Sequence, residues 1–102
     1  MLTTVPTYEE LMLPALRELA TFDQPVHIRE FVRHMISALQ MSEDAAHEML
    51  PSGKQTKMHN RDSRALWYMA QAGLVATPNR GVKQITEEGK TLLARGLPAI
   101  DN

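Results

Sequence analysis

The fold is decided by residues 57–86, which read KMHNRDSRALWYMAQAGLVATPNRGVKQIT. The first half of this stretch has apolar residues at helical spacing, namely Met58, Ala65, Met69 and Ala72. Gly73 follows directly, and glycine is the usual residue just past the end of a helix. The pattern therefore predicts a helix from about Thr56 to Ala72.

The second half of the stretch has the pattern of two short strands. Residues 74–78 and 82–85 are extended runs, and the segment between them is Asn79-Arg80-Gly81. Asn and Gly adopt the left-handed backbone that tight hairpin turns require. We therefore expect a β-hairpin directly after the helix.

Before this stretch, the chain carries signals for three further helices. Thr7-Tyr8-Glu9-Glu10 fits a capping box, which predicts a helix that ends near Thr21 and is kinked or restarted at Pro14. After the short extended stretch Gln24-Pro25-Val26, a helical apolar stripe predicts a second helix from Ile28 to Leu39. A third, shorter helix is expected from the Ser42 cap to about Leu50, before the break at Pro51-Ser52-Gly53.

A last helix is expected after the hairpin. Thr86 is its predicted cap, acids fill its first turn, and Gly96 and Pro98 mark its end. The predicted order is helix, strand, helix, helix, helix, hairpin, helix. This order predicts a mainly α fold with a small β-hairpin, an α+β winged helix-turn-helix, as one domain over residues 1–102 with a core at about 6–96.

The composition narrows the functional classes. The chain has no cysteine, which excludes disulfides, thiolate nucleophiles and zinc sites that use sulfur. Its start, Met-Leu-Thr-Thr-Val-Pro, lacks the basic and apolar regions of a signal peptide, and no apolar run is long enough to span a bilayer. We therefore expect a cytoplasmic protein without a membrane partner.

The charge is divided along the chain, although the net charge is only −1. Residues 1–50 hold three arginines against eight acids, which gives −5. Residues 52–83 hold six cations against Asp62 alone, which gives +5. Only the second segment is suited to contact phosphate.

The basic segment holds the candidate DNA-binding residues. Lys57, Asn60, Arg61 and Arg64 are spaced to share one face of the predicted helix, and Lys54 precedes them. Arg and Lys pair with guanine and phosphate, and Asn pairs with adenine, so this face suits a major groove. Asn79, Arg80 and Lys83 place similar side chains at the hairpin, where they suit an adjacent backbone or minor groove.

The chain also resembles a known family, the N-terminal domain of Mrr-like restriction proteins. The resemblance covers most of the chain and is carried, in order, by Leu50-Pro51-Ser52-Gly53, Asn60-Arg61, Tyr68-Met69, Ala72-Gly73-Leu74, Pro78-Asn79-Arg80-Gly81 and Ile85-Thr86-Glu87-Glu88-Gly89. It implies a winged-helix fold, a DNA-targeting role and a reading helix that includes Asn60 and Arg61. The sequence departs at Arg64, where the family pattern usually has Trp, and the nearest indole here is Trp67, which we expect to be a partly buried packing anchor. We expect no nuclease core after Asn102, so the resemblance does not imply cleavage.

No residue pattern predicts catalysis, a metal or a cofactor. Glu88-Gly89-Lys90 matches a fragment of nuclease motifs, but no Asp is placed to complete a magnesium site. Gly53-Lys54 lacks the first glycine and the hydroxyl residue of a phosphate loop, and the four histidines never occur at metal-binding spacing. We therefore expect a binding module and not an enzyme.

Two functions remain open. The first is a module that binds double-stranded DNA, either as a regulator or as the targeting part of a restriction system whose nuclease is a separate subunit. The alternative is a winged-helix module for protein–protein contact or dimerisation, in which the acidic part of one copy meets the basic part of another in a homodimer.

Overall fold

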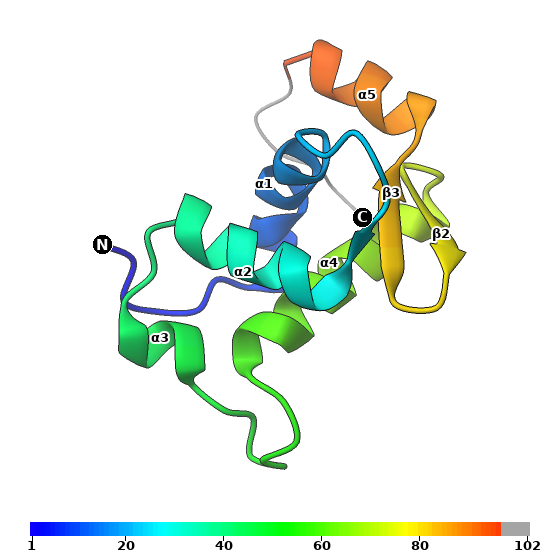
Figure 1. Cartoon of the computed structure of the whole chain (residues 1–102). Helices are drawn as coiled ribbons and strands as arrows, with labels where there is room; N and C mark the ends of the chain where they lie inside the picture. Colours follow the sequence, from blue (N-terminus) through cyan, green and yellow to red (C-terminus); the bar gives the residue numbers. More distant parts are fainter. Residues whose placement is uncertain (97–102) are drawn as a thin grey trace.

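The computed structural model describes residues 1–96 of the 102 (Figure 1). Its elements are α1 (Tyr8–Leu19), β1 (Val26–His27), α2 (Ile28–Ala38), α3 (Glu43–His47), α4 (Lys57–Gln71), β2 (Val75–Asn79), β3 (Val82–Ile85) and α5 (Glu87–Ala94). This is the order that the sequence predicts, and it confirms the α+β class. The last helix ends at Ala94, and Gly96, predicted to mark its end, has a φ of +66°. Pro98, the other predicted end signal, lies outside the described residues.

The capping box predicted for α1 is present. The backbone N–H of Glu10 donates to the Thr7 hydroxyl over 3.2 Å, and the Thr7 N–H donates to the Glu10 carboxylate over 3.0 Å. These bonds hold the pKa of Glu10 below its ordinary value. Pro14 lies inside α1 and does not restart it, because the helix runs on to Leu19.

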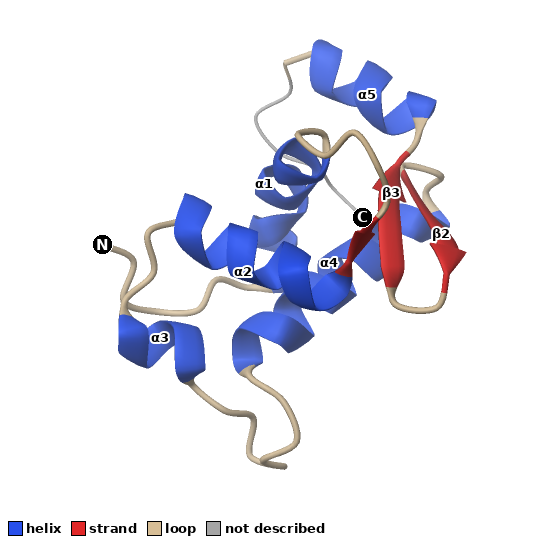
Figure 2. Ribbon diagram, viewed as in Figure 1, coloured by secondary structure: helices blue, strands red, loops and turns tan. Residues whose placement is uncertain are grey.

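The three strands form one antiparallel sheet in the order β1-β3-β2 (Figure 2). Val26 pairs with Lys83, and Val75 pairs with Ile85. The hairpin between β2 and β3 turns at Arg80-Gly81, and Gly81 has a φ of +77°, which side chains rarely tolerate. Both the predicted hairpin and its need for glycine are confirmed.

The core lies between α1, α2, α4 and the sheet. Its largest buried apolar side chains are Phe31, Leu11, Met12, Leu16, Leu19, Met35, Met58, Leu66 and Met69. The helix α4 packs mainly on α1 and also contacts α2, α3 and β2. This arrangement of helices and hairpin is compatible with the predicted winged helix-turn-helix.

The third helix is shorter than the sequence predicts, so its predicted end at Leu50 is wrong. It ends at His47, and Glu48 is already extended. Leu50 precedes a proline, a position that disfavours helical backbone. The segment instead turns back on itself, because the Leu50 N–H donates to the carbonyl of Gln55 over 3.0 Å and Met49 bridges to Thr56.

None of the described helices combines the length and the apolar character needed to cross a membrane.

Candidate nucleic-acid interface

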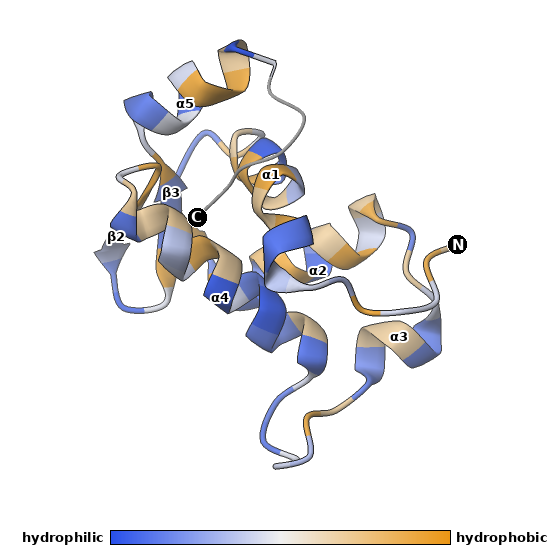
Figure 3. Cartoon of the chain, turned by 180° about the vertical axis from the view of Figure 1, so that it is seen from behind, coloured by the Kyte–Doolittle hydropathy of each residue, from blue (hydrophilic) through white to orange (hydrophobic). Residues whose placement is uncertain are grey.

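The helix α4 has one buried face and one outward face. Its buried side chains are Met58, Asp62, Ala65, Leu66 and Met69. Since each residue turns the helix by about 100°, the opposite line contains Asn60, Arg64, Trp67 and Gln71. Figure 3 shows that the first half of α4 is predominantly hydrophilic. The structure therefore leaves a mainly polar line of α4 outside the core.

Two residues of the predicted basic stripe are engaged within the protein. Lys57 forms an ion pair with Glu48, with 2.6 Å between Nζ and the carboxylate. Arg61 donates from Nη1 to the carbonyl oxygen of Pro6 over 3.2 Å and is partly buried. Lys57 is thus engaged with the segment before α4, and Arg61 is engaged with the segment before α1.

The other two stripe residues lie closer to solvent. Arg64 is exposed, and its guanidinium lies 4.3 Å from the centre of the Tyr8 ring. A cation over an aromatic face is held in place without losing its charge. Asn60 is partly exposed, with no side-chain hydrogen bond within residues 1–96. Arg64 and Asn60 are therefore the stripe residues best placed to meet a ligand.

An aromatic cluster extends the outward face of α4. Tyr8 stacks on Tyr68 with ring centres 4.8 Å apart, and Trp67 contacts Tyr68 edge-on at 5.1 Å. Trp67 was expected to be a partly buried packing anchor; its contact is with the edge of Tyr68, and 55% of its surface is exposed. Its position on the line through Asn60 and Arg64 turns the indole away from the core.

The remaining predicted residues lie in the hairpin and in the loop before α4. Asn79 and Arg80 are exposed at the hairpin turn, whereas Lys83 is partly buried and donates from Nζ to the Thr77 hydroxyl over 3.1 Å. Lys54 is exposed in the loop before α4. The hairpin lies near the end of α4 and this loop lies at its start, so the two groups are at opposite ends of the helix (Figure 1).

The structure adds Arg29, a cation at the start of α2 that the sequence analysis did not select. The His27 Nδ1 accepts a hydrogen bond from the Arg29 backbone N–H over 3.2 Å and caps α2. The pKa of His59 on α4 is lowered mainly by burial, and further by the charges of Arg29 and His27. His27 and Arg29 were missed because they belong to residues 1–50. The negative net charge of that segment gave no reason to expect a phosphate contact there.

A buried carboxyl group lies beneath the outward face of α4. Asp62 is 0% exposed, and neither of its oxygens has a hydrogen-bond partner among the described residues. Burial raises the pKa of Asp62 from 3.8 to about 8, so at pH 7 the group is mostly neutral. The segment 52–83 is then more positive than its formal charge. Helical spacing gave a signal for this burial, since Asp62 follows Met58 by four residues and precedes Ala65 by three.

The chain matches the family described as the Mrr N-terminal domain over residues 8–95. It belongs to this family. The match runs from the first residue of α1 to the C-cap of α5, so it includes every helix and strand described above. No curated protein and no solved structure matches the chain. The resemblance inferred from the sequence is thereby confirmed.

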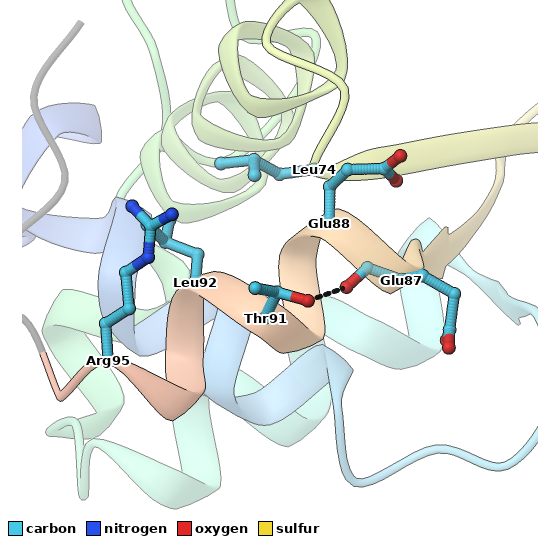
Figure 4. Close-up of a pocket in the computed structure, with 6 residues that line it drawn as sticks. All are labelled: Leu74, Glu87, Glu88, Thr91, Leu92 and Arg95. Atoms are coloured by element: carbon cyan, nitrogen blue, oxygen red, sulfur yellow. Dashed lines mark hydrogen bonds between the residues drawn. The ribbon is translucent and has the colours of Figure 1, made fainter.

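The Glu88-Gly89-Lys90 segment of this Mrr N-terminal domain lies on α5, away from α4. Glu88 lines an open pocket together with Leu74, Glu87, Thr91, Leu92 and Arg95 (Figure 4). The Thr91 hydroxyl donates to the Glu87 carbonyl over 3.0 Å, which is a contact within the helix. Within residues 1–96, no group of three His, Cys, Asp or Glu side chains is arranged to hold a metal ion.

Proposed function

We propose that this Mrr N-terminal domain binds duplex DNA, with α4 in the major groove. The observation that carries the proposal is the outward line of α4 through Asn60, Arg64 and Trp67, which lies opposite the buried side chains of the helix. Arg and Asn side chains match the hydrogen-bonding edges of guanine and adenine in that groove. The indole adds an apolar surface of the kind that contacts the thymine methyl group.

The hairpin supplies the second contact of the proposal. Asn79 and Arg80 are exposed at its turn, and Lys83 lies close behind. A basic turn beside a reading helix can follow the phosphate backbone or enter a minor groove. Lys54 and Lys57, at the other end of α4, are proposed to add phosphate contacts there. The Arg61 contribution is expected to be smaller, because its guanidinium already binds Pro6.

We propose that the domain acts as the DNA-targeting part of a restriction system in the cytoplasm. It needs no cofactor, and we propose no reaction for the described domain. Cleavage, where it occurs, would come from a nuclease on a separate subunit that this module directs to DNA.

The test is a titration of a fluorescent duplex of about 20 base pairs at low and moderate salt. Affinity should fall steeply with salt, and Arg64→Ala and Arg80→Ala should each cost about 1–3 kcal/mol of binding free energy. Arg95→Ala is the matched control, because Arg95 is an exposed cation at the C-cap of α5 and its removal changes the net charge equally. Equal losses for all three variants, or no binding at low salt, would refute the proposal.

The exposed indole also supports a second candidate, a protein-contact surface. Aromatic residues are enriched at the centres of protein interfaces, and Trp67 is 55% exposed. In this alternative the module forms a homodimer or binds another protein through α4. Light scattering at two salt concentrations distinguishes the candidates, since salt-sensitive self-association without DNA binding would favour the homodimer.

A further inference from the structure

The hairpin turn is anchored on the residues that begin α2. The Ile28 N–H donates to the Gly81 carbonyl over 2.8 Å. A Cβ on Gly81 would lie 3.3 Å from His27 Nε2, so the imidazole lies directly against the turn. The position of Arg80 relative to the first turn of α2 is thus fixed by two contacts.

The first turn of α4 lies close to the same residues. The charges of Arg29 and His27 contribute to lowering the pKa of His59, and α2 packs against α4. His59 is on the opposite flank of α4 from Arg61, which points to Pro6. The two flanks therefore differ, because Arg61 on one is engaged with the N-terminal segment and His59 on the other lies toward the start of α2.

Arg29 has no neutralising partner in this group. It is exposed, and its side chain forms no ion pair or hydrogen bond within residues 1–96. Arg80 is also exposed, and its side chain likewise forms no ion pair or hydrogen bond within residues 1–96. The nearest acid along the chain is Glu30, which is also exposed and likewise forms no ion pair among the described residues. Arg29 and Arg80 are thus two exposed guanidinium groups without an ion pair, one in the first turn of α2 and one in the hairpin turn that contacts the start of α2.

We infer that Arg29 binds a backbone phosphate of duplex DNA, on the side of α4 that lies toward the start of α2. The inference rests on the proposed function and identifies which flank of α4 lies along the DNA backbone. A guanidinium without an internal partner loses no ion pair on binding, and it releases counterions from the phosphate that it neutralises. Arg29 and Arg80 then contact the backbone together, beside the α4 residues that enter the groove.

The experiment compares Arg29→Ala with the intact chain in the duplex titration, over a series of salt concentrations. We expect an affinity loss of about five-fold and a decrease of about one in the slope of log affinity against log salt. Arg29→Lys should keep the slope, because it keeps the charge. Arg95→Ala should change neither quantity, and circular dichroism should show that all variants are folded, since the Arg29 backbone N–H that binds His27 is retained.

The possible outcomes separate this inference from the proposed function. If the intact chain binds duplex DNA and Arg29→Ala binds it with the same affinity and the same salt slope, the inference is wrong and the proposed function stands. If the intact chain does not bind at low salt, both fail. If Arg29→Ala and Arg29→Lys lower the affinity equally without changing the slope, Arg29 contributes no charge contact and the inference is likewise overturned.

Discussion

Arg61 of α4 donates a hydrogen bond from Nη1 to the carbonyl oxygen of Pro6, which precedes α1. The bond joins residues separated by 55 positions and is partly buried. A net contribution of about 1 kcal/mol is typical of such a bond. The side chain at the centre of the predicted basic stripe therefore also fixes the N-terminal segment to α4.

Replacement of Arg61 by Ala should lower the free energy of unfolding by about 1 kcal/mol, because the Pro6 carbonyl loses its donor. Urea denaturation followed by circular dichroism measures this change. Arg64→Ala is the control, since Arg64 is exposed and loses only its contact with the Tyr8 ring. We also expect Arg61→Ala to weaken DNA binding less than Arg64→Ala does, and the reverse order would contradict the view that Arg61 is mainly structural.

The buried Asp62 should make stability depend on pH. Its folded pKa of about 8 lies above the ordinary 3.8, so between these values the folded protein holds a proton that the unfolded chain has released. The contribution of Asp62 to stability is complete below pH 3.8 and is lost as the pH rises to about 8. Across that range the free energy of unfolding should fall by up to about 1.4 kcal/mol per pH unit.

The measurement is urea denaturation at several pH values between 4 and 8, for the intact chain and for Asp62→Asn. The amide does not titrate, so the difference between the two stabilities should change steadily in favour of the variant as the pH rises. The comparison cancels the other titrating groups, Glu10 among them. Parallel pH profiles for the two proteins would show that Asp62 has an ordinary pKa and that water or another hydrogen-bond donor stabilises its carboxylate.

The close contact of Gly89 with the sheet gives another prediction. A Cβ at this helical position would lie 2.5 Å from the Leu74 carbonyl oxygen and 2.7 Å from Ile85 Cγ1. In an exposed helix Ala would be favoured over Gly by about 1 kcal/mol, but here the side chain would displace backbone. Gly89→Ala should therefore destabilise the domain by about 1–3 kcal/mol.

Thermal denaturation of Gly89→Ala tests this contact. Lys90→Ala is the control on the next residue, because Lys90 is exposed and its ion pair with Glu87 is at the surface. Such a pair contributes less than about 1 kcal/mol, so the control should melt close to the intact chain. If Gly89→Ala were more stable than the intact chain, α5 could not lie this close to the sheet.

The sequence predicted the helices and the hairpin because their signals are local. Capping residues such as Thr7, glycines such as Gly81 and apolar spacing each act within a few residues of the backbone that they shape. The early end of α3 was missed because it depends on how Leu50 and Gln55 fold back on each other, which neither residue shows by itself. The family was also predicted, from motifs that lie in order along the chain.

The candidate site was less predictable, because its charges are distributed by tertiary contacts. Helical spacing placed Lys57 and Arg61 on one stripe but could not show that Glu48 and Pro6 would engage them. Nor could it bring Arg29 of α2 near His59 of α4. The DNA-binding roles of the selected residues stay predictions, and the structure only divides them into engaged and unengaged side chains.

The single tryptophan offers a direct probe of the face that meets DNA. Trp67 is 55% exposed, so its fluorescence should be typical of an indole in water and strongly quenched by acrylamide. If α4 enters the major groove, a saturating duplex should reduce the quenching constant severalfold, because the indole lies on the line through Asn60 and Arg64. Trp67→Phe should remain within about 1 kcal/mol of the intact chain in stability, since it loses only part of an edge contact with Tyr68. Unchanged quenching under conditions where the duplex is bound would mean that the DNA lies on another surface, and that α4 is not the reading helix.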